Sequence, residues 1–523
     1  MVRVRMRGRN GRWVWRRQPV VTASAHGVGV HNFLTDAWAS AQSPAAGRQA
    51  TATEIDPVTG SSMSASPEGG ANPTAAPSFS RPSGVEKPAG PSPAGAPAGQ
   101  PDATRPRQIN PTLGETHSIN PLVAAYTESL EARGISPEYQ GFIVATLNGD
   151  VLAEHNADRL FNPASVTKVA TTLTAISRLG PDFRFKTYLY TDGTLDRSSG
   201  ILHGSLYVVG SGDPAFFAEN AMLIADKLNR TGIHEVDGNL FVLGQFYFNF
   251  SASREASAKA LRAVLSGDSG ATKSAFPRFL SMRSAEDRAG DSATTAQPVA
   301  PPKVKIAGQT ITDPAVNTTR LTMIAVHTSL PLIRVLKGLN DFSNNWMATV
   351  IGSLVGGPDA VERFLKTEVG FREDEVNFAT SSGLGSNAIS PRGTVTILRK
   401  LISYLRTKGL GLEDMLPIAG VDAGTLEKRF TDAFRGSVVG KTGTLNGVSA
   451  LAGVAYTRSK GPLLFVIYNH GRSAHTFRPI QDETIKKMIT LYGGPSPVKW
   501  APSIVPRVSE RADGPGGSTA KNK

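Results

Sequence analysis

The chain has 523 residues, of which 40% are hydrophobic, so it can hold two or three domains and at least one large core. It contains no cysteine, which excludes disulfides and cysteine-based metal sites, and no uninterrupted apolar run of membrane-spanning length. The net charge is +13, but seven arginines fall within the first 17 positions and the remaining charge is mixed in sign. No nucleic-acid-binding module is recognisable, whereas a basic exterior also suits the anionic polymers of a cell envelope.

Both ends of the chain have the composition of non-globular segments. Residues 1–41 combine the arginine-rich start with a weakly apolar stretch and small residues, the pattern of an imperfect export signal. Residues 42–117 consist mainly of Pro, Ala, Gly, Ser and Thr, which bury too little apolar surface to offset ordering, so we expect a disordered linker. A disordered tail is expected over 496–523. We favour an imperfect export signal, or a misassigned start codon, over a plain disordered tail, and therefore expect an exported, periplasmic protein without a transmembrane segment.

Two β-hairpins are predicted at opposite ends of the folded region. Asn-Gly pairs at 148–149 and 446–447 are strong hairpin signals, and each lies between two strand-like runs. These runs cover residues 142–147 and 151–154, and residues 437–445 and 448–456. A further strand over 463–468 and a helical pattern over 480–489 follow. Strands from both ends predict one antiparallel sheet.

The middle of the chain has a different pattern. Residues 201–250 predict short strands and a helix over 218–228. Residues 251–302 are rich in Ala, Ser, Gly and charge, and are expected to be mostly loop. We therefore expect an accessory domain over 201–315, inserted into a catalytic domain formed by 118–200 and 316–495.

The sequence Ser165-Val-Thr-Lys168 lies at a predicted helix start, where Asn162 is the N-cap and Pro163 occupies the first turn. Ser165 and Lys168 are three residues apart, so they share one face of the helix and their side chains can meet. A lysine buried beside another cation can lose its proton and serve as the base for a serine hydroxyl. The pattern favours Ser165 as a nucleophile and Lys168 as its base.

A Ser-x-Asn motif, Ser343-Asn344-Asn345, lies between two predicted helices. A loop between helices can direct Ser343 and Asn345 into a cleft. There the Ser343 hydroxyl can relay a proton to a leaving amine, and the Asn345 amide can hold both Lys168 and the substrate backbone.

A Lys-Thr-Gly motif, Lys441-Thr442-Gly443, lies on the strand that precedes the second hairpin. An edge strand can pair with an extended peptide, and Lys441 with the hydroxyls of Thr442 and Thr444 offers a carboxylate site. Gly443 permits close approach of a ligand to the backbone. The N–H of Thr444, together with that of Ser165, would complete an oxyanion hole.

Taken in this order, the three motifs describe a serine acyl-transfer site that is activated by lysine. The set resembles the low-molecular-mass penicillin-binding proteins of the D-alanyl-D-alanine carboxypeptidase/endopeptidase type, the S13 peptidase family, over about residues 120–492. Further matching motifs are Gly210-Ser211-Gly212-Asp213-Pro214, His327-Thr328-Ser329-Leu330-Pro331, Ser382-Gly383-Leu384, Ser390-Pro391 and Leu416-Pro417-Ile418-Ala419-Gly420-Val421-Asp422. The chain departs from the family pattern at Thr380-Ser381, where the family has Asp-Gly.

The resemblance implies an α+β fold of the penicillin-binding-protein/β-lactamase-like transpeptidase type. In that fold a five-stranded antiparallel sheet is flanked by helices, beside a helical cluster and with an inserted accessory domain. The resemblance also implies a serine D,D-carboxypeptidase or D,D-endopeptidase that acts on D-Ala-D-Ala-containing peptidoglycan stem peptides through an acyl-enzyme. β-Lactam antibiotics would be covalent inhibitors, and no metal or cofactor is implied. Oligomeric state stays open.

Other interpretations are a penicillin-binding scaffold with weak or no turnover, and a β-lactamase-like hydrolase. The latter would need a deacylating glutamate, and the surroundings of Ala379 supply none in a suitable motif. Residues 436–442 approach a phosphate-binding loop, but Arg435 stands where its first glycine belongs and a hairpin follows. A second Ser-x-x-Lys, formed by Ser496 and Lys499, lies in a proline-containing loop and is interpreted as chance.

Overall fold

The computed structural model describes residues 2–7, 13–18, 120–289, 299–312, 320–501 and 505. At the N-terminal end, β1 (Val2–Arg7) and β2 (Trp13–Gln18) pair antiparallel. Most of the expected export signal (1–41), the whole expected linker (42–117) and most of the expected tail (496–523) lie outside the described residues. Among the helices that are described, none is both long and apolar enough to cross a membrane.

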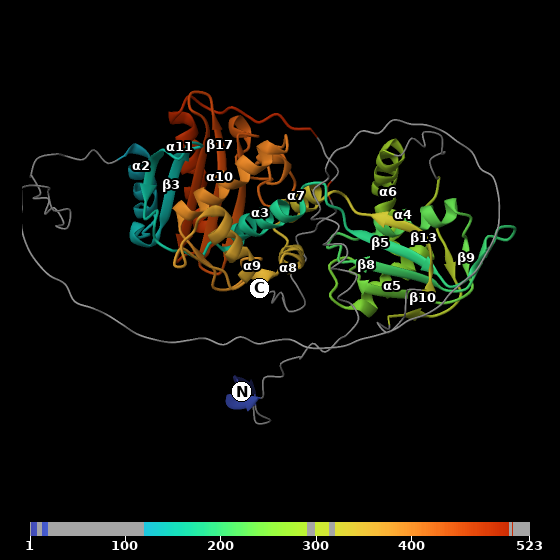
Figure 1. Ribbon diagram of the computed structural model, residues 1–523. Helices are drawn as coiled ribbons and strands as arrows, with labels where there is room; N and C mark the ends of the chain where they lie inside the picture. Colours follow the sequence, from blue (N-terminus) through green and yellow to red (C-terminus); the bar gives the residue numbers. More distant parts are fainter. Residues whose placement is uncertain are drawn as a thin grey trace, which may run out of the picture. The chain divides into compact units, whose positions relative to one another are not determined.

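One five-stranded antiparallel sheet combines strands from both ends of the folded region, which confirms the predicted fold class (Figure 1). Its strand order is β16-β17-β18-β3-β4. The two Asn-Gly hairpins join β3 to β4 and β16 to β17, so β18 is the strand that connects the two halves. The bounds are β3 (Gly141–Thr146), β4 (Val151–His155), β16 (Val438–Leu445), β17 (Val448–Thr457) and β18 (Gly461–His470).

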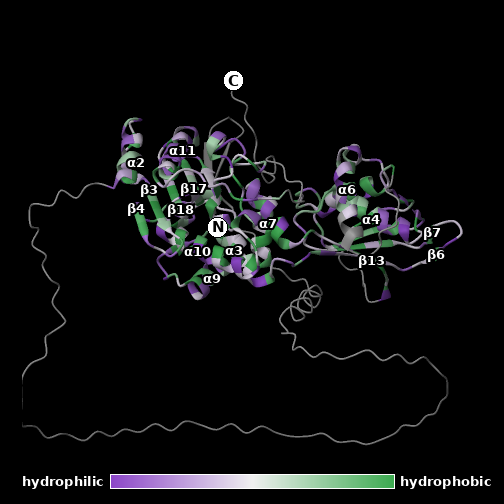
Figure 2. Cartoon of the chain, turned by 90° about the horizontal axis from the view of Figure 1, so that it is seen from above, coloured by the Kyte–Doolittle hydropathy of each residue, from purple (hydrophilic) through white to green (hydrophobic). Residues whose placement is uncertain are grey.

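Helices cover both faces of this sheet. On one face, α2 (Pro121–Glu131) and α11 (Ala474–Leu491) bury side chains such as Tyr126 and Phe477 against the strands. On the other face, α10 (Pro391–Thr407) and α3 (Thr167–Leu179) contribute to a second core cluster. Strand β18 is buried along most of its length because both of its faces are covered, and the strands of this sheet accordingly appear hydrophobic in Figure 2.

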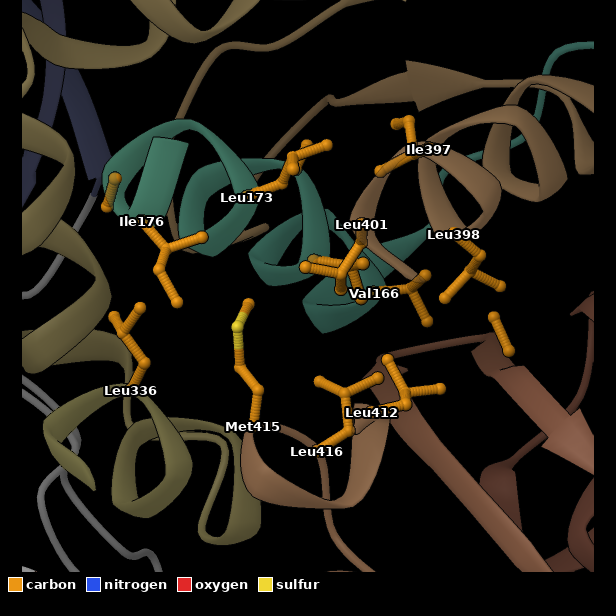
Figure 3. Close-up of a cluster of buried hydrophobic side chains, with 14 of the residues drawn as sticks. Val166, Leu173, Ile176, Leu336, Ile397, Leu398, Leu401, Leu412, Met415 and Leu416 are labelled. Carbon is orange, nitrogen blue, oxygen red and sulfur yellow. The ribbon is translucent and has the colours of Figure 1, made fainter. Parts of the chain in front are cut away.

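A helical cluster surrounds α3. It contains α7 (Leu332–Asp341), α8 (Asn345–Leu354), α9 (Gly357–Phe364) and a π-helical turn, Leu365–Val369. Figure 3 shows Leu173 and Ile176 of α3 together with Leu336 of α7 and Met415, all from the same buried cluster. The short elements are the 3₁₀ turns Pro137–Tyr139, Ala164–Val166, Leu412–Asp414 and Asp432–Phe434, and the strands β14 (Val376–Asn377) and β15 (Ala388–Ile389).

The inserted segment forms a core of its own around two further sheets. The five-stranded sheet has the order β12-β10-β8-β5-β13 and the four-stranded sheet the order β11-β9-β7-β6. The first comprises β5 (Lys186–Thr191), β8 (Leu206–Ser211), β10 (Leu240–Gln245), β12 (Thr310–Ile311) and β13 (Thr322–Thr328). The second comprises β6 (Thr194–Asp196), β7 (Ile201–His203), β9 (Glu235–Val236) and β11 (Lys305–Ile306). Helix α4 (Ala218–Arg230) packs in the same core.

The expected boundaries of this insertion, 201 and 315, are too narrow. Strand β5 precedes residue 201, and it pairs antiparallel with β8 and with β13, which follows residue 315. Hydrogen bonding within the sheet therefore assigns both strands to the insertion. Sequence periodicity did not show this, because strands of either sheet have similar apolar patterns.

The expectation of mostly loop over 251–302 is wrong for residues 254–289, which form α5 (Arg254–Leu265) and α6 (Gly270–Ala289). Ser253 caps α5 by accepting a hydrogen bond from the Ala256 N–H at 3.1 Å. The buried Leu261 and Leu265 join the core of the insertion. The alanine-rich composition resembles low complexity, but alanine is also the strongest helix former.

Candidate active site

The Ser-x-x-Lys sequence opens α3 through a tight 3₁₀ turn, Ala164–Val166, and the regular α-helix begins at Thr167. Ala164 has a left-handed backbone with φ of 47°, a conformation that is uncommon for residues other than glycine. Asn162 supports this turn, because its Oδ1 accepts from the Ala164 N–H at 2.9 Å and its Nδ2 donates to the Gly385 carbonyl at 2.7 Å. Asn162 therefore stabilises this turn but is not the predicted N-cap, because the 3₁₀ turn follows Pro163 and the α-helix follows Val166, later than expected.

Lys168 is fully buried and its ammonium nitrogen meets three oxygen atoms. Nζ lies 2.9 Å from Ser165 Oγ, 2.7 Å from Asn345 Oδ1 and 2.5 Å from the Ser382 carbonyl. The structure thus brings together the predicted Ser165, Lys168 and Asn345. Burial, reinforced by the charge of nearby Lys441, holds the pKa of Lys168 well below its usual value. A lysine in this setting can be neutral and accept a proton.

Ser343 lies in the tight link between α7 and α8 and has a left-handed backbone with φ of 55°. The next residue, Asn344, caps α8 by accepting from the Met347 N–H at 2.8 Å. This cap places Asn345 in the first turn of α8, where its side chain reaches Lys168. The Ser343 hydroxyl oxygen lies 2.7 Å from Lys441 Nζ. The second motif therefore contacts both lysines of the site.

Lys441 lies in the middle of β16 and is fully buried. Its ammonium donates to Ser343 Oγ at 2.7 Å and to the Thr442 carbonyl at 2.8 Å, so it faces the second motif and not solvent. Thr442 is also buried, with 8% of its surface exposed, whereas Thr444 is exposed. The sequence predicts that these three side chains form a carboxylate site, but of the three residues only Thr444 is exposed.

Gly443 allows β16 to pack closely against the turn that carries Ser165. A Cβ at this position would lie 2.5 Å from the Pro163 carbonyl oxygen and 3.1 Å from the Ala164 Cβ. Any side chain would push β16 away from the turn that carries Ser165. The motif predicts that Gly443 lets a ligand approach the backbone closely. The structure adds that this glycine lets the strand carrying Thr444 reach the serine turn.

The loop over 380–387 contains a site residue, Ser382, whose role the sequence does not indicate. The Ser382 carbonyl is the third acceptor for Lys168, and the Ser381 carbonyl accepts from Thr171 Oγ1 at 2.7 Å. Gly383 has φ of 85°, and a Cβ there would lie 2.0 Å from the Ala164 carbonyl. The family resemblance had marked Ser382-Gly383-Leu384, but a backbone acceptor leaves no side-chain signal of its role.

Asp341 is a second residue near the site without a sequence signal. It ends α7, two positions before Ser343, and is 4% exposed. Burial lowers the pKa of Lys441 to about 7, and attraction by Asp341 opposes this effect. Burial also raises the pKa of Asp341 to about 7, against the attraction of Lys337. The two buried groups therefore influence each other's charge near neutral pH.

Two motif-like segments lie apart from this arrangement. Residues 438–442 of the phosphate-loop-like stretch belong to strand β16, so they do not form a loop that opens a helix. Ser496 of the second Ser-x-x-Lys is exposed, and its N–H donates to the Tyr456 carbonyl at 3.0 Å. Lys499 is likewise exposed and lies outside the described helices.

The sequence matches the D-Ala-D-Ala carboxypeptidase 3 (S13) family over residues 123–248 and 262–490. A D-alanyl-D-alanine carboxypeptidase from Actinomadura sp. (strain R39) is 24% identical over 449 residues, which cover 68% of this chain and 82% of the relative. The carboxypeptidase DacB of Mycolicibacterium smegmatis is 32% identical over 166 residues, which cover 28% of this chain and 36% of the relative.

Two solved structures support the fold. The penicillin G-acylated predatory endopeptidase Bd3459 of Bdellovibrio bacteriovorus has a TM-score of 0.61 at 23% identity and covers 71% of this chain and 97% of its own. Penicillin-binding protein 4 of Haemophilus influenzae has a TM-score of 0.50 at 19% identity, over 71% of this chain and 99% of its own.

The family match extends over most of the folded region and includes all three motifs. The chain therefore belongs to the S13 family of D-Ala-D-Ala carboxypeptidases and is a serine-type hydrolase.

Proposed function

We propose that this serine-type D,D-carboxypeptidase/endopeptidase hydrolyses D-Ala-containing peptide bonds of peptidoglycan through an ester formed on Ser165. The observation that carries the proposal is the buried Lys168, whose Nζ lies 2.9 Å from Ser165 Oγ in a site that favours its neutral form. A neutral amine at this distance can take the hydroxyl proton as the bond to the substrate forms.

The acylation step requires two proton movements. Ser165 Oγ attacks the carbonyl carbon of the scissile bond and its proton passes to Lys168. The N–H groups of Ser165 and Thr444 would stabilise the oxyanion. Collapse of this intermediate breaks the C–N bond, and the proton reaches the leaving amine through the Ser343 hydroxyl, which lies next to Lys441. Water then hydrolyses the ester and restores Ser165.

Asn345 and Lys441 have supporting roles in this mechanism. The Asn345 amide oxygen accepts from Lys168 at 2.7 Å, which leaves its N–H groups for a substrate carbonyl. The positive charge of Lys441 favours the neutral form of Lys168. Lys441 therefore acts on the proton network, and the exposed Thr444 is the better candidate for contact with the terminal carboxylate of the substrate.

The first prediction concerns the nucleophile. Incubation of the purified protein with a labelled penicillin should give a covalent adduct, because the β-lactam acylates the same serine. Ser165→Ala removes the attacking oxygen and should abolish labelling. The chain supplies a matched control in its second Ser-x-x-Lys motif: Ser496→Ala should label like the unaltered protein. Persistent labelling of Ser165→Ala would contradict the assignment.

The second prediction distinguishes hydrolysis from a scaffold role. Incubation of the protein with purified muropeptides should release D-alanine, shorten cross-linked dimers or do both, as read by mass analysis. Ser165→Ala serves as the control for background hydrolysis. If the unaltered protein binds penicillin but leaves the muropeptides intact, the scaffold alternative is favoured. Released alanine without shortened dimers would identify a carboxypeptidase.

The third prediction concerns Thr444. Hydrogen bonds to charged groups contribute about 1.5–3 kcal/mol, so Thr444→Val should lower the acylation rate for peptides with a free terminal carboxylate roughly 10- to 100-fold. A substrate with an amidated terminus should lose much less. Thr490→Val, at another exposed threonine on α11, is a control that should leave both rates unchanged. Equal losses on both substrates would contradict the carboxylate contact, because Thr444→Val removes only the hydroxyl and keeps the backbone N–H of the oxyanion hole.

We also propose that the protein acts in the periplasm, because its substrate class is cell-wall peptide and its N-terminal region has the composition of an export signal. Cell fractionation should recover it with the periplasmic fraction. A cytoplasmic location would contradict this proposal and leave the peptidase activity without access to its substrate.

A further inference from the structure

Three charged side chains, two of them buried and the third, Asp422, partly exposed, form a cluster next to the second motif. Lys337 and Asp341 lie one turn apart on α7, and Asp422 ends the Leu416–Asp422 segment that matched the family without an assigned role. Lys337 Nζ lies 2.5 Å from Asp341 Oδ1 and 2.5 Å from Asp422 Oδ2. Lys337 and Asp341 are each only 4% exposed. The cluster thus joins α7 to the loop that follows Leu416.

The same loop is fixed to the end of α7 by backbone contacts. The Thr425 N–H and hydroxyl both donate to the Asp341 carbonyl, at 2.9 and 3.2 Å. Gly424 has φ of 114°, and a Cβ there would lie 2.3 Å from that carbonyl. Asp422 Oδ2 also accepts from the Ile418 N–H at 2.7 Å, which ties the carboxylate to its own loop. The end of α7, two residues before Ser343, is therefore held by side-chain and backbone contacts from one loop.

Stability alone is a weak reason for such a cluster. Removing the charges of Lys337 and Asp341 from water has a large desolvation cost, and replacing a buried ion pair by well-packed apolar side chains is often neutral or stabilising. The position of Asp341 offers another reason, because its charge acts on Lys441, the lysine that donates to Ser343 Oγ.

We propose that Lys337, Asp341 and Asp422 are positioning residues that hold the turn of Ser343 against Lys441 and set the charge that this lysine faces. Lys337 holds the Asp341 carboxylate by a direct ion pair, and Asp422 holds Lys337 in place from the loop. This inference rests on the proposed function, since it assigns the cluster to the same proton network.

The direction in which the pKa of Lys441 changes follows from the charges around it. These are Lys168 on α3 and Asp341 on α7. Lys337 and Asp422 act on Lys441 through Asp341. Asp341 is an anion on the alkaline side of its pKa, where it stabilises the Lys441 ammonium. Asp341→Asn removes that attraction, so the pKa of Lys441 falls and its proton is lost at lower pH. The alkaline limb of the acylation profile should then move to lower pH by about one unit.

The experiment measures the rate of penicillin acylation against pH for the full-length protein, with folding checked by thermal unfolding. Asp341→Asn should move the alkaline limb to lower pH and leave the acid limb, which reports Lys168, close to its original position. The double variant Lys337→Met/Asp341→Leu replaces the ion pair by apolar side chains and should show the same movement. It tests the proposal even if Asp341→Asn does not fold.

A buried ion pair elsewhere in the catalytic region supplies the control. Arg429 Nη2 lies 2.5 Å from Asp482 Oδ1, and Asp482→Asn should change stability without moving either limb. An unchanged alkaline limb in a folded Asp341→Asn or double variant would overturn the inference, as would an equal movement in Asp482→Asn. If the unaltered protein is not acylated at all, the proposed function fails and this inference fails with it.

Discussion

The burial of the Lys168 side chain is the constraint on which the rest of the site depends. Burial favours the neutral amine, and a buried amine without hydrogen-bond partners is costly, so polar atoms must be placed around it. The acceptors here come from three segments that are remote in the sequence: the serine turn, the start of α8 and the loop at Ser382. Each segment must reach one nitrogen atom, so the serine turn, the start of α8 and the Ser382 loop are positioned together around that point.

The site also requires that two backbone segments approach the serine turn closely, and a glycine makes each approach possible. Gly443 brings β16 against Pro163, and Gly383 brings the Ser382 loop against Ala164. The serine turn is therefore enclosed by backbone on both sides, and the left-handed conformation of Ala164 is held by these neighbours. A nucleophile in such a turn has little freedom to move, so its hydroxyl is oriented before any substrate arrives.

Sequence reasoning predicted the sheet and the motif residues because their signals are local. The two Asn-Gly hairpins mark β3–β4 and β16–β17, and the motif spacing brought Ser165, Lys168, Ser343 and Asn345 together as expected. The roles of Ser382 and Asp341 were not predictable, since one acts through a carbonyl and the other through burial, which depends on distant segments. The burial of Lys441 was not predictable for the same reason, because its place on an edge strand suggested an accessible cation. Helices α5 and α6 were missed because alanine-rich composition masked their buried apolar faces.

The pairing of β3 with β18 also has a consequence for biosynthesis. Val144 pairs with Phe465, so a ribosome must complete nearly the whole folded region before the central strand of the catalytic sheet can form. The inserted segment has its own core and all of its strands are translated earlier, so it can form first. Until β18 emerges, the apolar edge of the β3–β4 hairpin has no partner in its sheet. Non-local pairing of this kind slows folding and prolongs exposure of strand edges, which makes the nascent catalytic domain a natural client for chaperones.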